Sequence, residues 1–158
     1  MFIEDFVVTG TLNPEQINNV ETAPTKLIEG REGRIVVIES FYGRLDYAGK
    51  YYVLDYPGRG APQYTISTLE RPDLCAFGDV DFAILSSSYN AFCYLKRKKP
   101  VPYASFDDWY KNYVGKDLYF NLYNSPAKFI NGNSELKYRM DCKAIDPKLI
   151  FDVPKQKI

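Results

Sequence analysis

The sequence predicts an all-β fold, with antiparallel strands arranged as a sandwich or a barrel and one or two short helices. Tyr and Phe supply 14 and 10 of the 158 residues, and aromatic and β-branched side chains favour half-buried strands. Ten Gly and ten Pro residues are spread along the chain, so turns interrupt it often. About eight short strand-like segments, with only two helical ones, form the pattern that antiparallel sandwiches and barrels share.

The first segments are a strand, a short capped helix and a second strand. Residues 2–10 have the composition of a strand. Asn13 and Pro14 are residue types preferred at a helix N-cap and at the first helical position, so a helix is expected from there to Val20. Residues 25–29 are then expected to form a short strand.

The longest strand-like run covers residues 34–47, and its first half is apolar on both faces, as in a strand covered from both sides. Residues 50–56 follow after a Gly-containing turn, so they are its expected hairpin partner. Residues 135–144 show the clearest alternation, with one apolar face and one charged face. The other expected elements are strands at 63–69, 81–87, 91–98 and 118–123, and a short helix at 105–113 with a Ser cap and an acidic first turn.

The chain shows no internal repeat, linker or low-complexity tract, so a single domain over residues 1–158 is the simplest organisation. Its longest apolar stretches, such as residues 82–85, are far shorter than the ~20 residues of a membrane-spanning helix. Cys75, Cys93 and Cys142 are an odd number with wide spacing, which is typical of a reducing compartment. The sequence therefore predicts synthesis in a cytoplasm and no contact with a membrane.

The overall charge gives no reason to expect a nucleic-acid partner. Twenty basic residues balance twenty acidic ones, so no net field attracts the protein to a polyanion. Lys96–Lys99 is the one basic run of note. Beside a proline at the end of a strand, such a run is more typical of a solvated sheet edge than of a nucleic-acid site.

No set of residues points to catalysis or to metal binding. Histidine is absent, which removes the commonest general base and zinc ligand. The carboxylate pairs Asp79/Asp81 and Asp107/Asp108 fit a turn and a helix N-terminus at least as well as a hydrolase. Gly58–Gly60 lacks the Lys-Ser/Thr pair of a phosphate loop. The sequence predicts no enzyme, no catalytic residue, no metal and no cofactor.

Tyrosines are clustered in two parts of the chain. Tyrosine combines a large apolar ring with a polar tip, which suits a protein interface or stacking on a sugar. It also fills half-buried strand positions with no further role, and composition does not separate these three interpretations. The clusters are Tyr47, Tyr51, Tyr52 and Tyr56, and Tyr110, Tyr113, Tyr119 and Tyr123.

Two parts of the chain resemble small bacteriophage virion proteins. In that class a short helix is followed by an Ala-Pro-Thr segment, a buried strand and an Arg-Leu-x-Tyr strand, and the closing strand follows a Gly-Asn turn. The similar segments here are residues 15–20, 23–28, 33–38, 44–47 and 131–140. The resemblance covers roughly residues 9–56 and 117–145.

The resemblance implies a jelly-roll-like β-sandwich in a virion, made in the host cytoplasm. The expected function is that of a head fibre or capsid-decoration protein, with a tail fibre or tail adaptor component as the alternative. The expected partners are further copies of the chain, often as a homotrimer, other virion proteins, and a host-surface glycan. A lipocalin-like small-molecule or glycan-binding module stays open as a different class, because Gly49–Tyr52 follows a long strand-like segment.

If the protein is a virion component, residues 1–24 are an expected assembly-contact segment, and Asn13–Val20 belongs to contact surface instead of core. Deletion of residues 1–20 is then expected to leave a folded sandwich that assembles poorly. The candidate interface residues are Ile17, Val20, Tyr47, Tyr51, Tyr56, Trp109, Tyr110 and Tyr113.

Overall fold

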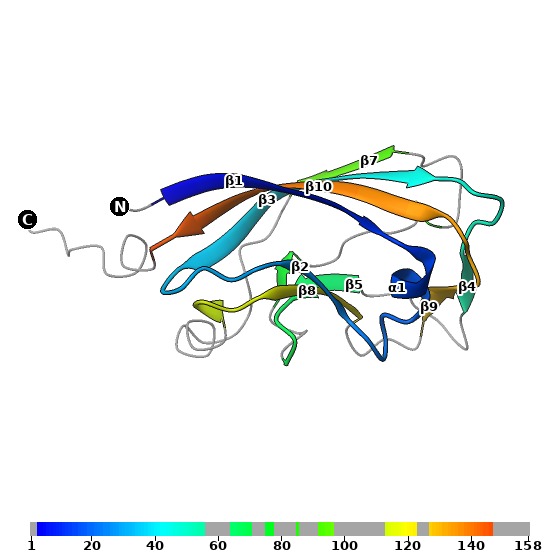
Figure 1. Ribbon diagram of the computed structural model, residues 1–158, viewed down its shortest axis with the longest axis horizontal. Coiled ribbons are helices and arrows are strands. Elements are labelled where there is room, and N and C mark those ends of the chain that lie inside the picture. The colour runs from blue at the N-terminus through cyan, green and yellow to red at the C-terminus, as the bar shows by residue number, and fades with distance from the viewer. Residues whose placement is uncertain are drawn as a thin grey trace, which may run out of the picture.

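The computed structural model of the protein has two layers of antiparallel sheet, joined at one end by a short two-stranded ribbon (Figure 1). The structure describes residues 3–55, 64–70, 75–77, 85, 92–96, 113–122 and 127–146. The first sheet has the order β1 (Ile3–Leu12), β10 (Glu135–Ile145), β3 (Ile35–Asp46), β7 (Phe92–Lys96). The second sheet has the order β2 (Thr25–Ile28), β8 (Leu118–Leu122), β5 (Tyr64–Ser67), β6 (Cys75–Phe77). The end ribbon pairs β4 (Val53–Asp55) with β9 (Lys128–Ile130).

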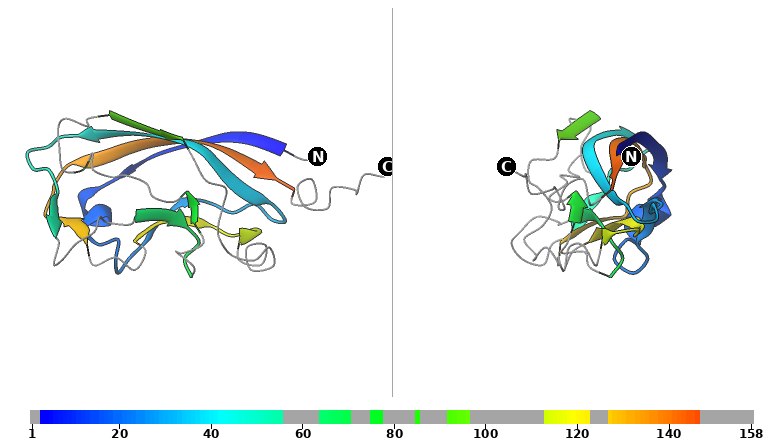
Figure 2. Two further views of the ribbon diagram at one scale, coloured as in Figure 1. Left: turned by 180° about the vertical axis from the view of Figure 1, so that it is seen from behind. Right: turned by 90° about the vertical axis from the view of Figure 1, so that its left-hand side faces the viewer.

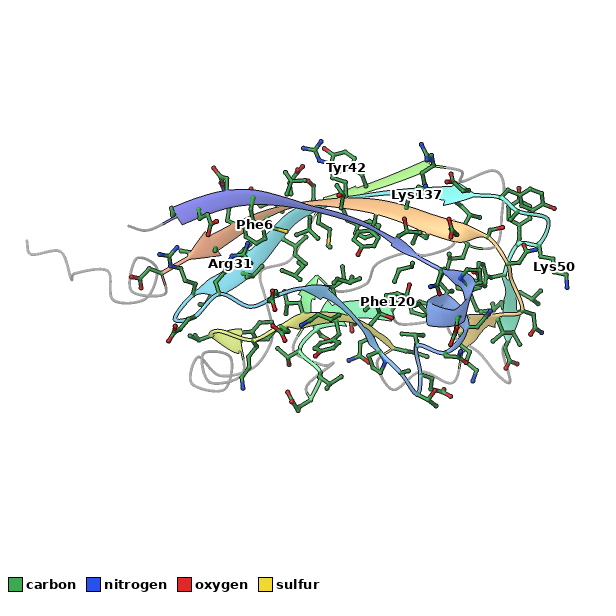
Figure 3. The ribbon with its side chains drawn as sticks, in the orientation of Figure 1. Phe6, Arg31, Tyr42, Lys50, Phe120 and Lys137 are labelled. Carbon is green, nitrogen blue, oxygen red and sulfur yellow. The ribbon has the colours of Figure 1, made fainter. Side chains whose placement is uncertain are left out.

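The predicted all-β class and the antiparallel pairing are confirmed, because every strand pair in the described residues is antiparallel. The same two layers are visible from behind in Figure 2. Phe120 lies between the sheets, whereas Tyr42 and Lys137 lie on the outside of the first sheet (Figure 3).

The strand β10 is the centre of the first sheet and carries the alternation predicted for residues 135–144. It pairs with β1 from Ile3↔Ile145 to Leu12↔Leu136, without a bulge. On its other side it pairs with β3, where a register shift leaves Glu39 as an extra residue. The inward-facing side chains of β10 are apolar and the outward-facing ones from Glu135 to Lys143 are charged, so one face packs in the core and the other faces water.

The second sheet is buried on both faces at β5, whose four residues are all inaccessible to solvent. On its inner face Tyr64 stacks on Phe120 and Phe129, with ring centroids 5.2 and 6.1 Å away. The hydroxyl of Tyr64 accepts the backbone N–H of Phe129 at 2.8 Å, so a buried phenol is satisfied by the end ribbon. Burial raises the pKa of Tyr64 to about 12.

The helix α1 (Pro14–Asn18) begins where the sequence predicts it. The Asn13 side chain accepts the backbone N–H of Gln16 at 2.8 Å, and the Gln16 side chain accepts the Asn13 N–H at 2.9 Å. This reciprocal capping box satisfies two backbone donors at the helix start. The cap also sets the direction of the helix, which turns Ile17 into the core, where it is fully buried.

The predicted hairpin between residues 34–47 and 50–56 is wrong. The strand β3 pairs with β10 and β7, and β4 pairs with β9. The reason is that Tyr52 turns into the core between the two strands, at 2% exposure, so the chain leaves the first sheet instead of folding back along it. The apolar alternation of β10 then matches the inner face of β3 over its whole length.

Several expected elements fall on residues that the structure does not describe. The helix at 105–113 lies outside the described residues except for Tyr113, and the strand at 81–87 does so except for Leu85. The strand expected at 91–98 is present as β7. None of the helices in the described ranges has the length and apolar character needed to span a membrane.

Candidate contact surface

The candidate site is a corner of the sandwich where β3 ends and the chain crosses to β4, at the end opposite the N-terminus in Figure 1. Tyr47, Val53 and Leu54 are 55%, 59% and 42% exposed, and Tyr51 is half-buried. The rings of Tyr47 and Tyr51 stack, with centroids 4.3 Å apart and 28° between their planes. We call these four residues the corner surface. The side chains of these residues expose large apolar groups to water, and the four residues lie within eight positions of one another in the sequence.

The corner is held by two side chains from the segment before β10. The Ser134 hydroxyl accepts the Ala48 N–H at 2.9 Å and donates to the Lys50 carbonyl at 3.0 Å. The Asn133 side chain accepts the Lys50 N–H at 2.8 Å and donates to the Ala48 carbonyl at 3.1 Å. The crossing backbone at residues 48–50 therefore has four side-chain hydrogen bonds, which replace the ladder that a hairpin would supply. The corner surface stands on a braced loop.

Tyr52 anchors the same corner from within the core. Its hydroxyl donates to the Ser134 carbonyl at 2.6 Å, and its backbone N–H donates to the Leu85 carbonyl at 2.8 Å. A Cβ atom at Gly132 would lie 2.4 Å from the Tyr52 ring, so only glycine allows this close approach. Burial raises the pKa of Tyr52 to about 12, so its hydroxyl remains a hydrogen-bond donor well into the alkaline range.

The arrangement at the corner is suited to contact. Tyr47 donates its hydroxyl to the Gly49 carbonyl at 2.7 Å, so its polar tip is occupied by the chain itself while its ring remains exposed. An aromatic ring with its polar end already satisfied loses little on desolvation and buries a large apolar area. Within the described ranges, no cluster of three or more carboxylates and cysteines has metal-binding geometry.

The outer face of the first sheet contrasts with the corner, because its charges are paired along the surface. Lys143 lies 2.6 Å from Asp5, Arg139 lies 3.0 Å from Asp141, and Arg44 lies 2.9 Å from Asp46. The hydrogen bond from the Ser40 hydroxyl lowers the pKa of Asp141, and the one from Arg44 lowers that of Asp46. The hydrogen bond to Asp5 raises the pKa of Lys143. This face is typical of a solvated surface.

Among the predicted interface residues that the structure describes, Tyr47 and Tyr51 contact each other at the surface. The prediction that Asn13–Val20 is contact surface instead of core is wrong at Ile17 and Val20, which are 0% and 2% exposed. Tyr113 is also buried in the core, at 3% exposure. These three side chains fill the space between the sheets, where their apolar area stabilises the monomer.

The other predicted positions lie outside the described residues. These are Tyr56, Trp109, Tyr110, the carboxylate pairs Asp79/Asp81 and Asp107/Asp108, Gly58–Gly60, and residues 97–99 of the basic run.

Sequence reasoning missed the bracing residues Asn133 and Ser134 and the exposed pair Val53 and Leu54. The residue types of Asn133 and Ser134 did indicate hydrogen bonds to backbone, because Asn and Ser in a turn commonly make them. Their partners are 83 to 86 residues away, and local patterns carry no information on that distance. For Val53 and Leu54 the strand-like composition favoured burial.

Comparison with protein-family models, with curated proteins and with solved structures finds no match to this chain. Function therefore has to be inferred from the fold and the corner surface.

Proposed function

We propose that the protein is a bacteriophage structural protein, a head fibre or capsid-decoration component, that works by binding copies of itself and other virion chains. The observation that carries this proposal is the corner surface, where Tyr47 and Tyr51 flank a loop held by four side-chain hydrogen bonds and Val53 and Leu54 are exposed on the neighbouring strand β4. A tail component would use the same mode of contact, and the virion would be its location in either case.

The strand order of the two sheets supports this class of protein. When the end ribbon is left out, the remaining eight strands have the order 1-8-3-6 in the first sheet and 2-7-4-5 in the second. Consecutive strands cross repeatedly between the layers, and we infer from this order a jelly roll. Jelly rolls of eight strands are used by viral capsid and lectin domains. A fold can host many functions, so the strand order supports the proposal only together with the surface.

The chemistry of the corner supports protein contact as its use. Tyrosine is enriched among residues that dominate interface energetics, and apolar neighbours exclude water around it. A braced loop loses little conformational freedom on binding, so more of the buried area contributes to affinity. The homotrimer implied by the resemblance would place three such corners around one axis.

The proposal is tested in cells that produce virus particles and express this protein. The particles are sedimented from the lysate, and the pellet is tested for the protein. The wild-type chain is expected in the particle fraction, and the double variant Tyr47→Ser/Val53→Ser is expected to stay in the supernatant. Lys137→Ser, on the solvated outer face, is the matched control and is expected to sediment like the wild type. A wild-type chain that never sediments with particles would overturn the proposal.

Glycan binding is the second candidate, and the stacked pair Tyr47 and Tyr51 is the observation that favours it. Exposed aromatic faces also stack on sugar rings. Retention of the purified chain on a glycan array, lost in Tyr47→Ala and Tyr51→Ala, would assign the corner to a sugar. Particle binding that survives in both variants would assign assembly to another surface.

A further inference from the structure

Among the described strands, none pairs with β1 on the side that faces away from β10. This strand forms one margin of the first sheet, it contains 10 residues, and β10 is the only described strand that pairs with it. In the end-on view of Figure 2, β1 and β7 lie at opposite margins of this sheet. An unpaired strand edge presents a row of backbone donors and acceptors that another strand can use.

The devices that usually protect such an edge are missing from most of β1. Phe6–Leu12 contains no charged residue and no proline, and its pairing with β10 has no bulge. The two acidic residues at its start are already engaged, since Asp5 is bound by Lys143 at 2.6 Å and Glu4 lies 3.7 Å from Arg31. A long, regular and largely uncharged edge is a template for strand addition.

The exposed face of β1 also carries unburied apolar groups. Ile3 and Val7 are 58% and 52% exposed and point away from the core, on the same face as Asp5. Their neighbours Phe6 and Val8 are on the other face, packed against the core. A partner strand beside β1 would cover part of Val7, which the isolated chain leaves in water.

We propose that the occupant of this edge is a second copy of the chain, with the two β1 strands antiparallel about a twofold axis and Val7 opposite Val7. The result is a continuous eight-stranded sheet made from the first sheet of each copy, each of which has four strands. A twofold contact is self-complementary and closes on itself, so it stops at two copies.

The register follows from the sequence of the strand. In a continuous antiparallel sheet, outward residues lie opposite outward residues, so a twofold pair must be centred on a single residue. Centring on Val7 places Asp5 opposite Thr9 and Glu4 opposite Gly10, with no like charges in contact.

The neighbouring registers are less favourable. Centring on Asp5 would put two carboxylates side by side, which destabilises a strand pair. Centring on Phe6 shortens the paired length by two residues. Centring on Val8 puts Glu4 opposite Leu12. The Leu12 side chain is 1% exposed and belongs to the core, so this register would place a charged side chain beside an apolar one.

Introducing a positive or a negative charge at Val7 tests both the contact and its register. Purified wild type, Val7→Lys and Val7→Glu are compared by light scattering and sedimentation over a range of concentrations, alone and as an equal mixture of the two variants. The wild type is expected to form dimers. Each variant alone is expected to dimerise with a roughly tenfold higher dissociation constant, and the equal mixture is expected to dimerise as strongly as the wild type. Only the register centred on Val7 brings the introduced Lys and Glu directly opposite each other.

The matched control is Leu69→Lys and Leu69→Glu, since Leu69 is 44% exposed and lies after β5, away from β1 in the sequence. These variants are expected to pair like the wild type, and circular dichroism and thermal unfolding check that all variants remain folded. A wild-type chain that stays single at all concentrations, or variants at Val7 that pair normally, would overturn the proposal, and so would a mixture that fails to regain pairing. The Val7 variants leave Tyr47, Tyr51, Val53 and Leu54 unchanged, so a loss of pairing in these variants is assigned to β1 and is separate from contact through the corner surface.

Discussion

Tyr52 shows how one residue decides the course of the chain. Its ring packs against Gly132, its hydroxyl binds the Ser134 carbonyl, and its backbone binds Leu85. These contacts tie together segments that are far apart in the sequence. They explain why the chain leaves β3 at the corner and does not form the hairpin that local composition predicts.

Replacing Tyr52 by Phe should lower the free energy of unfolding by about 1 kcal/mol, because the buried Ser134 carbonyl loses its donor. Urea unfolding measures the change. Tyr47→Phe is the matched control, since its hydroxyl bonds at an exposed position, and its effect is expected within about 0.5 kcal/mol. Equal stability of the two variants would contradict the assigned role of Tyr52.

The lowered pKa of Asp141 predicts that the protein loses stability in acid. The Ser40 hydroxyl lowers the pKa of this carboxyl below 3.8, so its contribution is present above pH 3.8 and disappears as the pH falls through the lowered pKa. Asp141→Asn should reduce stability near neutral pH, and its difference from the wild type should vanish in acid. Ser40→Ala should raise the pKa of Asp141 toward its usual value, measured by NMR titration. A pH dependence of unfolding that is the same in Asp141→Asn and the wild type would contradict this.

At the scale of elements, local patterns predicted the longer strands and the start of α1, but not the three-residue strands β6 and β9. The alternation in β10, the apolar run of β3 and the cap of α1 are each visible in a few consecutive residues. Pairing partners were not predictable, because β10 joins β1 and β3 across about 90 to 140 residues. The surface role assigned to α1 failed because five residues with one apolar side chain do not reveal the direction of the helix.

The burial of Ile17 predicts that α1 contributes to the stability of the monomer. Ile17→Ala removes a fully buried side chain and should cost about 3 kcal/mol. Ile3→Ala is the control in the same segment, at 58% exposure, and should change the stability by less than about 0.5 kcal/mol. Thermal or urea unfolding gives both values. A loss of particle association without loss of stability in Ile17→Ala would restore the helix as a contact element.

At the scale of the whole molecule, the N-terminal segment belongs to the sandwich. The strand β1 is paired over its full length, and Leu12, Ile17 and Val20 are part of the core. Within residues 3–24, these three side chains therefore serve the core, and assembly contact through this segment stays a prediction for its exposed residues. The exposed side of β1 remains available for contact, so this segment combines a structural face with a free edge.

Deletion of residues 1–20 is now expected to prevent folding, in contrast to the expectation from sequence. The truncation removes the partner strand of β10 and all three of those core side chains, Leu12, Ile17 and Val20. We expect loss of the cooperative thermal transition and aggregation of the truncated chain, measured by differential scanning calorimetry and light scattering. A truncated chain that unfolds cooperatively near the wild-type temperature would show that the rest of the sandwich is self-sufficient.

The central place of β10 has a consequence for how the protein is made. During translation β1 and β3 leave the ribosome long before β10, the strand that lies between them. Ile3 and Ile35, for example, both pair with Ile145. The first sheet can close only after residue 145 has emerged, so β1 and β3 of the nascent chain both lack their shared partner until then. Chaperone demand and losses to aggregation should therefore be greatest while residues 135–145 are still inside the ribosome.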